Sequence, residues 1–386
     1  MDEEKKAPFD TLVLVLVLGL SGLGLVMLLS ASSIMAEQRF GDANFFFRPQ
    51  LRNLILGLVL MVILARVPYQ TWLRLAYPIL TASLLGLALV LLPGVGHEVG
   101  GAHRWLRLPG FTFQPSETAK LAIVIYLAYS LSRKGARNAS LIYGLLPHLS
   151  VLGLTVGLIL AEPDLGTAFS VAIIAFIMMC VAGIRFWHLA ALSLAGGAVL
   201  YYEIISYSYR LRRIAAFLDP WSDPQGAGYH IIHSFYAFAS GGLWGQGPGA
   251  SQQKLFFLPE PHTDFIFSVL AEEVGLAGVF VVGVLFLVLL VRGLSIARAA
   301  MTRDYGGVYL ALGSTLVVVV PAFFNMAVVT ALIPTKGLPL PFFSYGGTNL
   351  MVCCAAMGLL MNIAGQCQDD MPRRVFRAFR KARSPE

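Results

Sequence analysis

Long apolar runs divide this chain, and they restrict its possible folds more than any other feature. A window of about 17 to 25 apolar residues can cross the hydrocarbon core of a bilayer as a helix. We identify ten such windows, near residues 11–34, 50–67, 72–92, 116–132, 141–161, 165–183, 186–206, 265–291, 305–332 and 345–364. In lipid, a helix satisfies all of its own backbone groups. The sequence therefore predicts an all-α polytopic membrane protein with about ten transmembrane helices.

Composition and charge agree with this prediction and give the orientation. Charged residues make up 13% of the chain, against about 25% in soluble domains. An even number of spans places both termini on one side. If that side is the cytoplasm, 17 of the 28 lysines and arginines lie inside and ten outside, with Lys120 left within a span. By the positive-inside rule, we expect both termini to be cytoplasmic.

This orientation places the long polar segments on the outer face. They are residues 93–115 and residues 207–264, the second being a large extracytoplasmic loop between the seventh and eighth spans. Residues 1–366 are expected to form a single transmembrane domain, and residues 367–386 a basic cytoplasmic tail. A cluster of cations next to a membrane span is typical of contact with anionic lipid.

The most distinctive polar stretch is SQQKLFFLPEPHTDFIF, at residues 251–267, where the chain enters the eighth span. It contains Glu260, His262 and Asp264. An ionisable residue in a membrane is costly and is kept only with a partner or a function. Asp264 could be the N-cap of the helix that follows. It could equally be a general base, since partial desolvation raises the pKa of a carboxylate towards neutrality.

Two further polar pairs lie at the outer ends of spans. Glu117 and Lys120 are spaced i, i+3 at the start of the fourth span and are close enough to pair. They could neutralise each other, or they could line a polar cavity. In the turn EPDLG we expect Asp164 to cap the next helix. Glu162 follows a long apolar run and is harder to explain as a solvated residue.

The remaining candidate functional residues are charged side chains in the large outer loop and in the eighth span. Arg210, Arg212 and Arg213 form a cluster suited to bidentate contacts with phosphate. The alternative is contact with lipid headgroups and no chemistry. Glu272 and Glu273 are expensive in lipid, so we expect each to have a partner inside the bundle.

Five ordered segments resemble the SEDS family of shape, elongation, division and sporulation proteins: RWLRLPGFTFQPSETAK, EPDLGTA, YRLRRIAAFLDPW, KLFFLPEPHTDFIFSVLAEEVGLAG and PTKGLPLPFFSYGG. The likeness covers about residues 10 to 366 and favours the cell-division branch over the elongation branch. The resemblance implies a ten-span peptidoglycan glycosyltransferase in the bacterial cytoplasmic (inner) membrane, at the division septum. Such an enzyme polymerises lipid II on the outer face and works with a class B penicillin-binding transpeptidase and other division proteins.

The resemblance also implies roles for particular residues. Asp264, in the motif HTDF, would be the catalytic carboxylate. Ten further residues would line the substrate cavity: Trp105, Gln114, Glu117, Lys120, Glu162, Arg210, Arg213, Lys254, Glu260 and Lys336. The chain departs from the family pattern at His230, where the family has glutamine, and this puts a glutamine-specific contact in doubt.

The residues fit this chemistry when they are considered by themselves. Transfer of a glycan from a lipid diphosphate needs a base for the attacking hydroxyl and positive charge for the leaving group. Asp264 can supply the first, and arginine and lysine side chains of the outer face the second. A divalent cation such as Mg²⁺ or Mn²⁺ could share that work, although no metal-ligand spacing requires one. We expect inversion at the anomeric carbon without a covalent enzyme intermediate.

Three alternatives stay open at this point. Ten spans with charges in a cavity could describe a flippase for a lipid-linked precursor. A flippase needs a polar path to the inner leaflet, whereas the ionisable residues here gather at the outer face. The chain could also be a non-catalytic division scaffold, or an elongation-type member of the same family.

Overall fold

The computed structural model describes residues 10–99, 102–108, 111–255, 258, 261–335 and 337–382, and within these ranges the chain is mainly helical. The helices are α1 (Thr11–Phe40), α2 (Phe47–Arg66), α3 (Tyr69–Arg74), α4 (Ala76–Val90), α5 (Pro115–Lys134), α6 (Leu146–Ala161), α7 (Leu165–Val181), α8 (Phe186–Ile205), α9 (Ser208–Leu218), α10 (Tyr229–Gly241), α11 (Ile266–Ala300), α12 (Tyr305–Val329) and α13 (Gly347–Ala382). Short 3₁₀ turns lie at Gly135–Ala139 and Pro220–Ser222, and a π-helical turn at Leu141–Leu145 leads into α6.

Helices occupy all ten predicted spans, which confirms the predicted fold class. Within the described ranges, seven are long and apolar enough to cross a membrane, namely α1, α2, the helix at Leu141–Ala161, α8, α11, α12 and the Gly347–Cys367 part of α13. Helices α4 and α7 are shorter apolar helices. The predicted span at residues 72–92 is divided into α3 and α4, because Leu75 leaves the helical conformation (φ −85°, ψ 9°).

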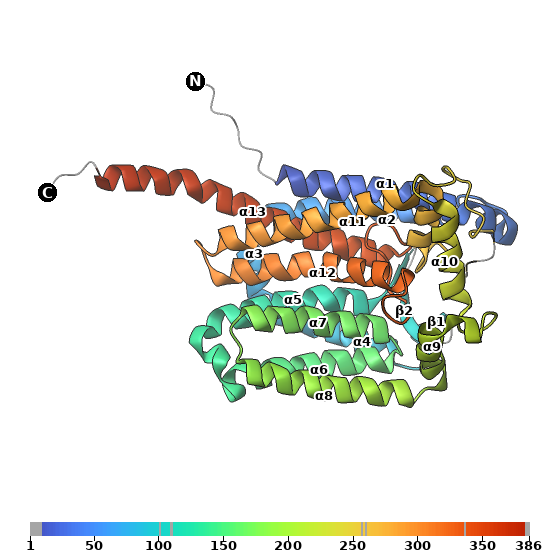
Figure 1. Ribbon diagram of the computed structural model, residues 1–386. Helices are drawn as coiled ribbons and strands as arrows, with labels where there is room; N and C mark the ends of the chain where they lie inside the picture. The colour runs from blue at the N-terminus through green and yellow to red at the C-terminus, as the bar shows by residue number, and fades with distance from the viewer. Residues whose placement is uncertain are drawn as a thin grey trace, which may run out of the picture.

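The long helices run side by side, and the bundle has two distinct ends (Figure 1). Helix α1 begins and α13 finishes at the same end, as the even number of spans requires. Helices α9 and α10 and the strands lie at the other end, which is therefore the outer one. The most apolar windows of α12 and α13 are 78% buried, so these helices form the centre of the bundle. The window of α8 is 6% buried, which makes α8 a peripheral helix.

The first outer loop contains a small sheet that the sequence analysis did not predict. Strands β1 (Gly96–Val99), β2 (Ala102–Leu108) and β3 (Phe111–Phe113) pair in the order β1-β2-β3, and both pairs are antiparallel. These strands are short and lie among glycines, so they give little alternating pattern for a sequence-based prediction. The sheet carries Arg104 and Trp105 on the outer side of the bundle.

The large outer loop folds back onto a break in α11. Gly275 has φ 75° and ψ −173°, which interrupts the helix and favours glycine. The tight turn at residues 242–247 supplies partners for the backbone groups that the break releases. The four hydrogen bonds are Gln246 N to Glu272 O (2.9 Å), Gly247 N to Glu273 O (3.0 Å), Leu276 N to Gly242 O (2.9 Å) and Ala277 N to Leu243 O (3.1 Å).

Candidate active site

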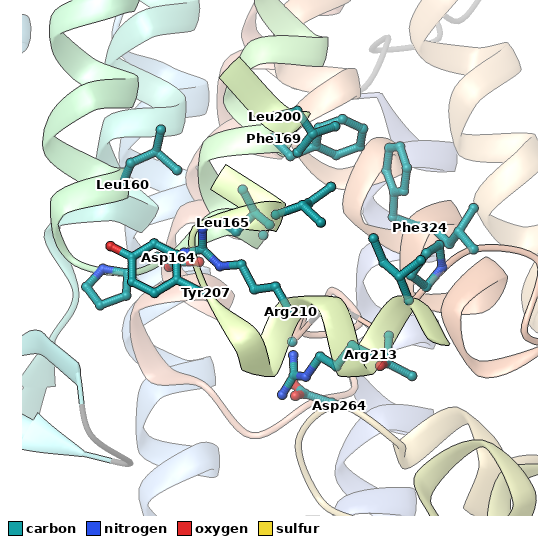
Figure 2. Close-up of a pocket in the computed structure, with 18 of the residues that line it drawn as sticks. Leu160, Asp164, Leu165, Phe169, Leu200, Tyr207, Arg210, Arg213, Asp264 and Phe324 are labelled. Carbon is teal, nitrogen blue, oxygen red and sulfur yellow. The ribbon is translucent and has the colours of Figure 1, made fainter. Parts of the chain in front are cut away.

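A cavity of about 870 Å³ lies at the outer end of the bundle (Figure 2). Its walls come from strand β2, the ends of α6, α7 and α8, the turn between α6 and α7, helix α9, Asp264, α12 and the segment 333–337. This volume is within the range of pockets that bind small molecules and cofactors, roughly 300 to 1,000 Å³. Elements far apart in sequence therefore meet around one space.

The cavity has a charged part and an apolar part. Among the described residues, the charged lining consists of three cations, Arg104, Arg210 and Arg213, and two carboxylates, Asp164 and Asp264. The apolar lining includes Leu160, Phe169, Leu200, Ile204 and Phe324. In Figure 2, Phe169 and Leu200 lie together on one side, and Arg213 and Asp264 on the other. Such a space can accept an anionic group joined to a long apolar chain.

Asp264 lies at the charged end of the cavity and is half-buried. Helix α11 begins at Ile266, and its N-cap is Phe265, which makes no side-chain cap hydrogen bond. The structure therefore assigns the N-cap position to Phe265, and Asp264 lies one position before it. The side chain of Arg213 extends towards Asp264 (Figure 2). A half-buried carboxylate that faces a cavity is placed to accept a proton from a bound hydroxyl.

The backbone around Asp264 is fixed by α12 and by the segment that precedes α13. The amide of Asn325 donates to the carbonyls of Asp264 (2.9 Å) and Leu338 (2.7 Å). The hydroxyl of Ser344 donates to the carbonyl of Thr263 at 2.5 Å. These bonds hold the position of the carboxylate, as catalytic groups require.

Two histidines pack beside this segment. The ring of His262 lies 4.3 Å from that of Phe46, and burial, together with the charge of Arg39, lowers its pKa to about 4. His262 is therefore neutral at physiological pH. His230, the departure from the family pattern, stacks on Phe265 with ring centroids 5.4 Å apart. Glu260, which the sequence analysis placed in the substrate cavity, lies outside the described residues.

The arginines reach the cavity from two elements. Arg210 and Arg213 lie one turn apart on α9, and both line the cavity. Arg210 is buried, whereas Arg212 and Arg213 are both exposed, and Arg212 does not line the cavity. Arg104 comes from strand β2 and donates to the carbonyls of Glu162 (2.9 Å) and Pro163 (2.6 Å). The sequence analysis did not assign Arg104 to the cavity. The strand itself was not predicted, so the sequence did not show that Arg104 and Trp105 lie on opposite faces of β2.

The turn between α6 and α7 supplies buried carboxylates. Asp164 is the N-cap of α7, and its Oδ1 accepts from the backbone N–H of Thr167 at 3.0 Å, which confirms the predicted cap. The side-chain amide of Gln114 donates to Asp164 Oδ2 at 3.4 Å. Glu162 is fully buried. Burial and the nearby charge of Asp164 raise the pKa of Glu162 to about 8, against the opposing effects of Arg104 and the hydroxyl of Ser116.

Glu117 and Lys120 form the predicted ion pair at the start of α5. Their side chains are buried, with Lys120 Nζ 2.7 Å from Glu117 Oε2. Neither residue is among those that line the cavity, and the same is true of Trp105, Gln114 and Glu162. The contact of these five residues with a substrate therefore stays a prediction.

Lys254 is bound in a buried network away from the lining residues. Its ammonium contacts Glu273 Oε1 (2.8 Å), Ser30 Oγ (3.0 Å) and the carbonyl of Gly249 (2.7 Å). Glu272 accepts from the backbone N–H groups of Gln252 (3.0 Å) and Gln253 (3.1 Å). Both glutamates therefore have the partners that were predicted, and both hold the outer loop to α11. Lys336 lies outside the described residues.

Comparison with known proteins agrees with the resemblance seen in the sequence. The model of a family described as "Cell cycle protein", named for FtsW, RodA and SpoVE, matches residues 10–369. A probable peptidoglycan glycosyltransferase FtsW from Trichlorobacter lovleyi is 46% identical over 358 residues, which are 93% of each chain. Stage V sporulation protein E of Bacillus subtilis is 39% identical over 360 residues, covering 93% of this chain and 98% of that protein.

A solved structure shows the same fold. It belongs to work on the coordination of polymerization and crosslinking by a peptidoglycan synthase complex, and the matched chain has a TM-score of 0.76 and 31% identity. The match covers 93% of this chain and 98% of that one. The fold, the ordered motifs and the family match agree along nearly the whole chain. The chain therefore belongs to the SEDS family of cell cycle proteins, the family of FtsW, RodA and SpoVE.

Proposed function

We propose that this protein is a peptidoglycan glycosyltransferase that polymerises lipid II at the outer face of the cytoplasmic membrane. The observation that carries the proposal is the position of Asp264 in a cavity that combines arginines with an apolar wall. Lipid II joins a disaccharide peptide to an undecaprenyl chain through a diphosphate. The arginines match the diphosphate in charge, and the apolar wall matches the start of the lipid chain.

In the proposed reaction, Asp264 removes the proton from the attacking sugar hydroxyl. The hydroxyl oxygen forms a bond to the anomeric carbon of the second substrate, and the bond from that carbon to the diphosphate oxygen breaks. The lipid diphosphate leaves with the electron pair of that bond, and the anomeric configuration inverts. Positively charged groups near the leaving oxygen stabilise the charge that develops on it. Arg213 and Arg104 are the candidates, because both line the cavity that holds Asp264.

Substrate contacts of Trp105, Gln114, Glu117, Lys120 and Glu162 remain part of this proposal, although these residues are not among those that line the cavity. The described residues bring together no group of three or more His, Cys, Asp or Glu side chains that could hold a metal ion. The curated relatives named FtsW support a role in division at the septum. The solved peptidoglycan synthase complex supports a class B penicillin-binding transpeptidase as the partner.

The test uses full-length protein in vesicles with its transpeptidase partner and labelled lipid II, without ATP. We expect glycan strands from the wild type. Arg213→Gln should lower kcat/KM for lipid II by about ten- to a hundredfold, since a hydrogen bond to a charged group contributes about 1.5 to 3 kcal/mol. Arg212→Gln is the matched control, because Arg212 is the exposed neighbour that does not line the cavity.

Two results would contradict the proposal. One is transbilayer movement of lipid II with no polymer, which would favour the flippase. The other is an equal effect of the two arginine substitutions, which would show that the cavity does not bind the diphosphate through Arg213.

A further inference from the structure

The corner between α8 and α9 forms one wall of the cavity but has little else to hold it in place. Leu200 and Ile204 reach the cavity from α8, and Arg210 and Arg213 reach it from α9. Only Ser206 and Tyr207 separate the two helices. The apolar window of α8 is 6% buried, so packing against the bundle does little to hold this helix. The position of Arg213 therefore depends on the angle at this corner.

One buried contact closes the corner. The guanidinium of Arg210 forms an ion pair with Glu203 Oε2, and Nη1 also donates to the backbone carbonyl of Glu203 at 2.9 Å. The same guanidinium lies over the ring of Tyr207, 4.3 Å from its centroid. The exposed fractions of the two side chains are 5% for Arg210 and 20% for Glu203. Arg210 thus joins the last turn of α8 to the first turn of α9 through three kinds of contact.

The side chains of Arg210 and Arg213 point in different directions, and this difference matters for the reaction. Arg210 and Arg213 are one turn apart on the same helix, so an element that fixes Arg210 also fixes Arg213. In Figure 2 the side chain of Arg210 runs back towards Tyr207, whereas that of Arg213 runs towards Asp264. The positive charge of Arg210 is already matched by Glu203, whereas Arg213 extends to the reacting end of the cavity.

We infer that Glu203 and Arg210 form a latch between α8 and α9, and that this latch positions Arg213 in the cavity that contains Asp264, for stabilisation of the leaving diphosphate. Glu203 is thereby a positioning residue, and Arg210 acts mainly through the latch instead of through a contact with the substrate. The inference rests on the proposed function for its catalytic consequence, but not for the latch itself. Misplacement of a catalytic group by about 1 Å can lower a rate a hundredfold.

The test compares Glu203→Gln, Arg210→Gln and the double variant in the lipid II assay with the partner present. A latch predicts that each single substitution lowers kcat by about tenfold or more, with KM changed less than kcat. It also predicts that the double variant is no slower than either single variant, since the same contact is lost in all three. Glu203→Asp keeps the charge and should retain more activity than Glu203→Gln.

A second measurement does not depend on activity. Hydrogen exchange of the amides of α9, residues 208–218, should be about tenfold faster in Glu203→Gln and Arg210→Gln, because losing a partly buried ion pair destabilises the local structure. Exchange in α12 should be unchanged, which shows that the bundle is folded. Arg212→Gln, on the same helix, should match the wild type.

The outcomes separate the latch from its alternatives. If Arg210→Gln raises KM while Glu203→Gln behaves as the wild type, Arg210 binds the diphosphate directly and the latch is wrong. Unchanged exchange in α9 for both variants would also overturn it. If the wild type forms no glycan at all, the proposed function fails, and the exchange rates alone still decide whether the latch exists.

Discussion

Replacing Lys254 by methionine distinguishes a structural lysine from one that binds substrate. The ammonium of Lys254 lies 2.8 Å from Glu273, and the side chains of the pair are only 3% and 1% exposed. The substitution removes the cation and leaves the carboxylate of Glu273 buried, with Ser30 as its remaining partner. Breaking a buried ion pair in this way costs about 3 to 5 kcal/mol. Solvent screening reduces this cost little, because both groups are out of water.

The assay is equilibrium unfolding in a mixed-detergent titration with SDS. Lys254→Met should lower the free energy of unfolding by about 3 kcal/mol or more. The double variant Lys254→Met/Glu273→Leu should recover most of this loss, since an apolar pair can replace a buried ion pair at small cost. Arg298→Met is the control. Arg298 is an exposed cation on α11, the helix that carries Glu273, and its loss should change the free energy of unfolding by less than about 0.5 kcal/mol.

The opposite pattern would refute this reasoning. If Lys254→Met unfolds as the wild type does but raises KM for lipid II, the lysine contacts the substrate, as the resemblance implied. Its ion pair with Glu273 would then not represent the working state.

Three further predictions concern single residues. The pKa of Glu162 is raised to about 8 from an ordinary value near 4.5, so the wild type should lose stability as pH rises from about 4.5 to 8. Glu162→Gln should remove that loss. If the free energy of unfolding changes equally between pH 5 and pH 9 in the wild type and the variant, the prediction is contradicted. Gly275→Ala should cost more than about 2 kcal/mol, because φ is 75° and a Cβ would lie 2.4 Å from Gly245 N. Gly283→Ala, in the same helix with no atom within 4 Å, should be neutral or slightly stabilising, and equal unfolding of the two variants would show that α11 is not broken. Asn325→Ala should lower kcat by about tenfold or more with KM nearly unchanged, because the backbone of Asp264 loses its support. Thr330→Ala, an exposed residue at the end of the same helix, is its control, and an Asn325→Ala rate equal to the control's would rule out the positioning role.

The spans were predictable from the sequence, because in lipid the backbone must be satisfied within each helix. The predicted orientation came from the distribution of lysine and arginine between the two sides. The contacts Glu117–Lys120 and Asp164–Thr167 could also be predicted, because the residues of each pair are three positions apart and local helix geometry determines such contacts. Asp264 was assigned to the reacting centre by motif resemblance, and the structure places it in a cavity with arginines.

The remaining features depend on contacts between distant parts of the chain. The resemblance assigned Lys254 to the substrate cavity, and its contacts with Ser30 and Glu273 form only when α1 and α11 pack together. The link from Arg104 to the carbonyl of Glu162 likewise joins a strand to a turn 58 residues away. The break at Gly275 is invisible in an apolar run, because hydropathy does not report φ. Contacts between residues so far apart in the chain can be predicted only once the tertiary fold is known.

The most direct test of the account is single-turnover polymerisation by Asp264→Asn. The substitution keeps the size of the side chain and its place in the cavity but removes its ability to accept a proton. We predict that this variant, bound to its transpeptidase partner, binds lipid II about as tightly as the wild type and forms glycan about 10²- to 10⁴-fold more slowly. Polymerisation at the wild-type rate would contradict the account, because the base would then have to be another group.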